Sequence, residues 1–105
     1  KLDVSGTGRF TSTITATNFI LSSDERMKQN ILSYKSSYID IDYKTYQLKS
    51  DPSEQRFGVI AQELELKYPE LVKTGSDGMK SVSYIDLLVR EVAYLKERVK
   101  QLEAK

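Results

Sequence analysis

Residues 83–105 read SYIDLLVREVAYLKERVKQLEAK, and this segment carries the strongest periodic signal in the chain. Its apolar residues recur at alternating intervals of three and four, which is the a and d pattern of a coiled coil. The pattern covers three heptads and predicts a helix over about 83–105, with Ser83 and Asp86 as a capped start. The predicted contact residues are Ile85, Leu88, Val92, Leu95, Val99 and Leu102.

The charges beside this stripe favour a parallel assembly. With Ile85 at position a, Glu91 and Arg98 occupy g positions, and Lys96 and Glu103 occupy e positions. In a parallel in-register coiled coil each g residue faces the e residue five positions on in the partner, so both pairs are attractive. The alternative is a single helix packed on its own domain. Branched residues at a with Leu at d nominally favour a dimer, so the helix alone leaves the number of copies open.

The region between residue 23 and this helix mixes strand and helix signals. It predicts an alternating strand with a bulge or turn between Tyr43 and Tyr46, then a turn, a buried strand, a short helix that stops before Pro69, and a hairpin loop followed by a strand. These elements fall, in order, at 38–49, 50–52, 57–61, 62–68, 75–78 and 80–82. Together with the terminal helix they predict an α+β fold with a small mixed β/α domain.

Residues 1–22 have a different composition. Ser or Thr occupies eight of these positions, and only Lys1, Asp3 and Arg9 are charged. Apolar or small residues alternate with Thr over 10–17, which predicts a β-strand. A lone strand does not persist in water, so we expect it to pair with a preceding sheet or with other copies in an intertwined stem. A frayed terminus is the alternative. The boundary is expected at 22/23, and the absence of an initial Met predicts a C-terminal piece of a longer protein.

Composition narrows the possible functions. The 105 residues contain no His, Cys or Trp, which excludes a Ser-His-Asp triad, a cysteine nucleophile and a Cys/His zinc site. A net charge of +1 gives little attraction for nucleic acid, and no apolar run is long enough to span a membrane. We therefore expect no metal, no cofactor, no nucleic acid and no membrane. The apolar fraction is low for so short a chain, which favours oligomerisation.

Two polar features remain as candidates for chemistry. Asp40 and Asp42 alternate on one strand face, where a cation site is possible and a solvated face is the stronger interpretation. Ser23 and Lys28 are a hydroxyl and an amine five residues apart, and a Ser–Lys dyad is one of the few nucleophile–base pairs that this composition permits.

The spacing of Ser23 and Lys28 by itself argues against a dyad. Five residues of a regular helix rotate by about 140°, so the dyad requires a turn at Ser23 or a lysine from another subunit. A lysine base must also be neutral, which Arg26 would favour and Asp24 and Glu25 would oppose. From spacing alone a helix cap is the stronger interpretation, with Ser22 and Glu25 forming a capping box.

Three ordered motifs resemble a known family. They are SDERMKQNI at 23–31, FGVIAQELELKYPELV at 57–72, and the G-x-K-S-V-x-Y step at 78–84 that leads into the heptad helix. Together they resemble the self-cleaving intramolecular chaperone domain that closes many phage tailspikes and tail fibres, a relative of which occurs in the myelin regulatory factor family. The likeness covers about 22–105, and the preceding residues look like the end of a fibre stem.

The resemblance implies a homotrimer that gathers and registers three chains of a fibre stem and then cuts itself off in cis, as a single-turnover serine peptidase. The implied scissile bond joins Ser22 and Ser23, with Ser23 as nucleophile and Lys28 as general base. Ser22 is the less favoured nucleophile, and Lys28 from the same or a neighbouring subunit remains open. The implied setting is assembly in the host cytoplasm, with the stem kept in the virion tail and the chaperone released. The alternatives are a non-cleaving trimeric cap, or the related domain of a self-releasing transcription factor.

Overall fold

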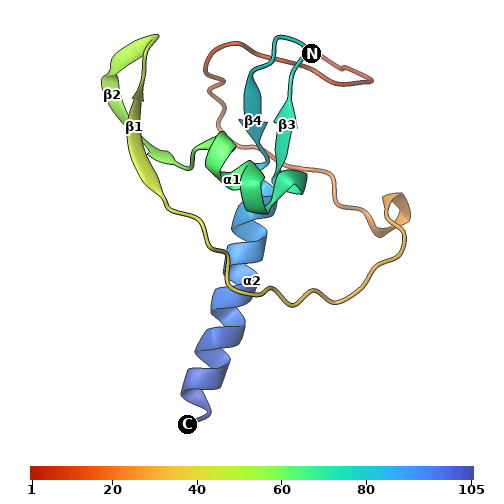
Figure 1. Cartoon of the computed structure of the whole chain (residues 1–105). Coiled ribbons are helices and arrows are strands. Elements are labelled where there is room, and N and C mark those ends of the chain that lie inside the picture. Colours follow the sequence, from red (N-terminus) through yellow and green to blue (C-terminus); the bar gives the residue numbers. More distant parts are fainter. The chain divides into compact units, whose positions relative to one another are not determined.

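The computed structural model describes residues 1–105 and divides into two compact units, Lys1–Leu32 and Ser33–Lys105. We call the second unit the body. The body contains two antiparallel hairpins and two α-helices, and this small mixed β/α arrangement confirms the predicted α+β class (Figure 1). The predicted boundary at 22/23 separates the end of the fibre stem from the chaperone domain, and it stays a prediction.

The first hairpin pairs β1, Lys44–Leu48, with β2, Asp51–Gly58. Its register shifts between Tyr46 and Leu48, whereas the slip in the alternation had predicted a bulge or turn between Tyr43 and Tyr46. The predicted strand began at residue 38, whereas β1 begins at Lys44. The predicted turn at 50–52 is displaced as well. Leu48 pairs with Asp51, so the turn is a two-residue loop at positions 49 and 50.

The second half of the body follows the sequence signals closely. Helix α1, Ala61–Lys67, stops before Pro69, which opens the 3₁₀ turn η2, Pro69–Leu71. Strands β3, Val72–Thr74, and β4, Lys80–Val82, form the predicted hairpin. Figure 1 shows α1, this hairpin and the start of α2 side by side.

The hairpin loop depends on its glycines. The Gly75 N–H donates to the Met79 carbonyl at 2.8 Å, and the Gly78 N–H donates to the Gly75 carbonyl at 2.9 Å. Gly78 has φ +80°, a conformation that is costly for residues with a Cβ. The predicted loop at 75–78 is confirmed.

The prediction of a buried strand over 57–61 is partly wrong. Phe57 lies in β2 but is 75% exposed, whereas Val59 is buried and Ala61 already begins α1. The apolar run therefore crosses from an exposed hairpin into the core.

Helix α2, Tyr84–Glu103, confirms the predicted helix and presents two different faces. Leu87 is fully buried and packs in the core with Ile39, Val59, Leu64, Leu71 and Val72. The six heptad residues are instead 49–59% exposed. One face thus fixes the helix to the body, while the heptad stripe is uncovered. We call this stripe the seam.

Ser83 is the N-cap residue of α2, as predicted, but its side chain does not cap the helix. Its carbonyl accepts the Leu87 N–H at 3.1 Å, and its hydroxyl donates to Asp86 Oδ2 at 2.7 Å. Its side chain makes no capping hydrogen bond to a backbone N–H.

The unit Lys1–Leu32 contains one short 3₁₀ turn, η1, Glu25–Met27. Residues 10–17 form no strand in the single chain. The predicted strand requires a paired neighbour, so it stays a prediction. The predicted capping box of Ser22 and Glu25 is wrong, because Asp24 occupies the N-cap and its carboxylate accepts the Arg26 N–H. No helix of the chain is long and apolar enough to cross a membrane.

Candidate functional site

Ser23 and Lys28 meet across the turn η1. The Lys28 ammonium donates to Ser23 Oγ, and the Nζ–Oγ distance is 2.5 Å. The hydrogen bond goes to Ser23 and not to Ser22, the other candidate nucleophile. We call residues 23–28 the processing turn.

The backbone of the processing turn explains how two residues five apart come together. The Met27 N–H donates to the Asp24 carbonyl and the Lys28 N–H to the Glu25 carbonyl, both at 3.0 Å. The helix ends after Met27, and Lys28 is extended with φ −117° and ψ 153°. Because the segment is a single 3₁₀ turn with extended ends, it avoids the angular separation that a regular α-helix would impose.

Asp24 and Arg26 fasten this turn. Asp24 Oδ1 accepts from the Arg26 backbone N–H at 2.9 Å and from Nε at 3.1 Å, while Oδ2 accepts from Nη2 at 2.8 Å. The Arg26 side chain, and secondly its backbone N–H, hold the pKa of Asp24 below its usual value, and Asp24 raises the pKa of Arg26. The guanidinium near Lys28 is therefore paired with a carboxylate.

The predicted trimerisation residues form the second candidate site. The side chains of Ile85, Leu88 and Val92 line an open apolar hollow of ≈ 480 Å³ on α2, together with Val89, Ala93 and the stem of Lys96. The other seam residues continue the exposed stripe along the helix. Exposed apolar stripes of this length mark interaction surfaces.

Glu91 has an intrachain partner that the sequence did not reveal. Its Oε2 accepts a hydrogen bond from the Tyr43 hydroxyl at 2.6 Å. Burial, followed by this carboxylate, raises the pKa of Tyr43 to about 12. The residues are 48 positions apart, and no local sequence signal predicts the pair.

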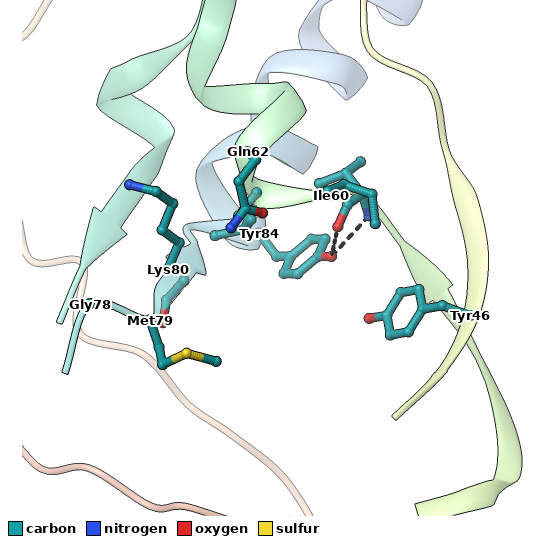
Figure 2. A pocket seen from close by; sticks show the side chains of 11 residues that line it. Tyr46, Ile60, Gln62, Gly78, Met79, Lys80 and Tyr84 are labelled. Carbon is teal, nitrogen blue, oxygen red and sulfur yellow. Dashed lines mark hydrogen bonds between the residues drawn. The ribbon is translucent and has the colours of Figure 1, made fainter. Parts of the chain in front are cut away.

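Two of the resemblance motifs converge at Tyr84. Its hydroxyl accepts the Val59 N–H at 3.0 Å and lies 3.4 Å from the Val59 carbonyl oxygen (Figure 2). A Cβ on Gly58 would collide with that hydroxyl, so only glycine allows the approach. Figure 2 shows the hydroxyls of Tyr84 and Tyr46 pointing toward each other at the edge of a pocket of ≈ 520 Å³. The motifs at 57–72 and 78–84 are thus held together by a side-chain-to-backbone hydrogen bond.

The acidic candidates are paired with lysines. Asp40 contacts Lys67, and Asp42 Oδ2 lies 3.2 Å from Lys44 Nζ. No group of three or more acidic side chains gathers in a metal-binding arrangement. The lysine pairs favour the solvated-face interpretation of Asp40 and Asp42.

The chain thus combines a small α+β body, an uncovered heptad seam and a hydrogen-bonded Ser–Lys pair. Residues 23–73 match the model of the family Peptidase_S74, described as the chaperone of endosialidase. Over these residues, just under half of the chain, the protein is therefore similar to the endosialidase-chaperone family. Comparison with curated proteins and with solved structures gives no match.

This match confirms the resemblance drawn from the motifs. It supports a chaperone role in tail-fibre assembly, and the name of the family indicates a peptidase. The match begins at Ser23 and ends at Lys73, so it includes the processing turn and the first two motifs. The motif at 78–84 and helix α2 lie beyond the matched residues.

Proposed function

We propose that this domain trimerises and registers the chains of a phage tail fibre or tailspike and then releases itself by cutting the bond between Ser22 and Ser23. The observation that carries the proposal is the 2.5 Å contact between Lys28 Nζ and Ser23 Oγ, in a segment matched by a peptidase family. Ser23 is the nucleophile and Lys28 the general base of a single-turnover reaction in cis.

The proposed reaction begins with an attack by Ser23 Oγ on the carbonyl carbon of Ser22. Lys28 acts here as the neutral amine: it takes the hydroxyl proton and passes it to the departing amide nitrogen of Ser23. The C–N bond breaks and an ester joins Ser22 to Ser23 Oγ. Water then hydrolyses the ester, leaving a carboxylate on Ser22 and a free amine on Ser23.

The turn geometry suits this reaction because nucleophile and base are already within hydrogen-bond distance. The Asp24–Arg26 pair closes the turn between them without occupying either reacting atom. We assign Asp24 and Arg26 a positioning role in cleavage.

The seam supplies the proposed assembly function. Three parallel α2 helices would bury the exposed residues at a and d, while Glu91 and Arg98 would face Lys96 and Glu103 of the next copy. Joining three chains by one domain makes the pairing of their stems effectively intramolecular, which raises the local concentration of each strand. In this proposal assembly takes place in the host, and the stem that includes residues 1–22 remains in the virion tail.

The test is an intact mass under denaturing conditions of the parent chain, Ser23→Ala, Lys28→Ala and the matched control Ser22→Ala. Fragments 1–22 and 23–105 are expected in the parent and in Ser22→Ala, and only the full-length mass in the other two. A parent that stays intact as a trimer would instead support a non-cleaving cap. Normal cleavage in Lys28→Ala would remove that lysine from the mechanism.

A further inference from the structure

A second apolar hollow lies between the hairpin β1–β2 and the start of α2. It measures ≈ 300 Å³, and its walls include Tyr43, Thr45 and Phe57 from the hairpin and Tyr84 and Leu88 from the helix. We call it the hairpin hollow. Phe57 is 75% exposed although it is paired in a strand, so a large aromatic ring is left in water beside a concave apolar surface.

The hairpin hollow is continuous with the seam. Leu88, a d residue, lines both the hairpin hollow and the hollow of ≈ 480 Å³ farther along α2. The two hollows therefore flank the same stripe of the helix, one on each side.

The heptad register identifies the side of the stripe on which the hairpin hollow lies. In the register that places Ile85 at a, both Tyr84 and Glu91 are g residues, and the hairpin is tied to Glu91 by the Tyr43 hydroxyl at 2.6 Å. The hairpin hollow therefore lies on the g side. Val89 occupies an e position, where charged residues are usual, and it is 57% exposed.

In a parallel coiled coil the g side of one helix faces the e side of the next, and the g residue Tyr84 faces the e residue five positions on, which is Val89. We propose that the hairpin hollow receives Val89 of a neighbouring copy, so that the hairpin extends the subunit interface beyond the seam. This inference rests on the proposed trimerisation. It explains why an apolar residue stands at an e position and why Phe57 is uncovered in the single chain.

The absence of Trp from the chain provides a direct probe. Phe57→Trp, placed in the full chain with Ser23→Ala to prevent cleavage, is followed by fluorescence emission over a dilution series, with sedimentation reporting the oligomer. The emission is expected to shift to the blue as trimers form. Leu66→Trp is the matched control, because Leu66 on α1 is 85% exposed and does not line either hollow.

A second pair of variants, made in the Phe57→Trp chain, tests the occupant. Val89→Asp is expected to raise the concentration at half-assembly at least about tenfold and to return the emission of the introduced tryptophan to the red, because a carboxylate cannot enter an apolar hollow without loss of hydration. Leu66→Asp is expected to change neither. Circular dichroism of both variants checks that the body remains folded.

The outcomes separate this inference from the proposed function. Trimers in which the introduced tryptophan stays red-shifted would overturn the inference and leave trimerisation standing. Blue emission that persists in dilute monomers would show that the chain's own residues fill the hollow, which also overturns it. A chain that is monomeric at every concentration would overturn the proposed trimer and the inference with it.

Discussion

The processing turn and the body are stabilised over very different distances along the chain. In the turn, the side-chain hydrogen bonds of Ser23, Asp24, Arg26 and Lys28 join residues no more than five positions apart, and none of these residues is buried. In the body, hydrogen bonds join residues 25 and 48 positions apart, and α2 contributes the fully buried Leu87. A segment stabilised only locally can change shape or be cut without unfolding its neighbour, which suits the self-cleavage that we propose.

This comparison implies that stability and cleavage are separable. Variants in the core should change the free energy of unfolding of the body, while variants in the turn should change the rate of cleavage alone.

The largest expected effect is on the body. Leu87→Ala removes a fully buried side chain from the contact between α2 and the core, and we expect it to lower the free energy of unfolding by about 2–5 kcal/mol. Urea unfolding at a fixed protein concentration measures the change. Leu66→Ala makes the same truncation at a site that is 85% exposed and is expected to cost no more than about 0.5 kcal/mol. Equal losses in the two variants would contradict the described core.

A smaller effect is expected in the turn. Asp24→Asn keeps the size of the side chain but weakens its charge-assisted hydrogen bonds to Arg26, so we expect cleavage to slow by about tenfold. The rate is measured by mass spectrometry of fragment 23–105 over time, and the melting temperature of the body should not move. Glu25→Gln, which changes a neighbouring carboxylate without a hydrogen bond to Arg26, serves as the control. A normal rate in Asp24→Asn would end the positioning role.

Because Arg26 lowers the pKa of Asp24, the same pair predicts a dependence on pH. A depressed pKa means that the folded turn favours the ionised carboxylate, so the stabilisation is present above the ordinary pKa and is lost as the pH falls through the folded value. Cleavage that depends on the Asp24–Arg26 pair should therefore keep this contribution at neutral pH and lose it in acid. The ratio of the release rate of fragment 23–105 in the parent to that in Asp24→Asn should therefore fall toward one across the acid range, because every other acid-dependent step is common to both chains.

The smallest effect is expected at alkaline pH. The pKa of Tyr43 is raised to about 12, so the folded body favours the neutral phenol that donates to Glu91. This contribution is complete below the ordinary tyrosine pKa near 10 and is lost as the pH rises from about 10 to 12. The melting temperature of the parent should fall more over that interval than that of Tyr43→Phe. Ultraviolet absorbance of tyrosinate should show one group fewer titrating late in the variant, and identical profiles would contradict the Tyr43–Glu91 bond.

Much of the body could be predicted because its signals are local. The period of residues 83–105 predicted α2, Pro69 predicted the end of α1, and the glycines at 75 and 78 predicted the second hairpin. The long strand β2 was missed, since Pro52 suggests a turn. A two-stranded hairpin has open edges on which proline is tolerated.

The candidate site likewise has features that the sequence predicted and features that it did not. The sequence by itself limited the possible chemistry, because a chain without His or Cys leaves a Ser–Lys dyad as one of the few available nucleophile–base pairs, and it predicted the seam through the heptad period. The choice of Ser23 and Lys28 came from the resemblance of the motif at 23–31. Whether Ser23 and Lys28 meet was not determined by spacing, since a regular helix would separate them and only a 3₁₀ turn with extended ends lets them touch.

The tertiary structure alone decided the contacts made across long loops. The Tyr84 hydroxyl on the backbone of Val59, the glycine at 58 that makes room for it, and the Tyr43 bond to Glu91 have no local sequence signal. Closing such loops costs chain entropy that only the packed core offsets, so these pairs exist because Leu87 and its core neighbours bring the elements together. Local periodicity fixed the helices and turns of this protein, whereas the burial of a few leucines decided which of their side chains meet.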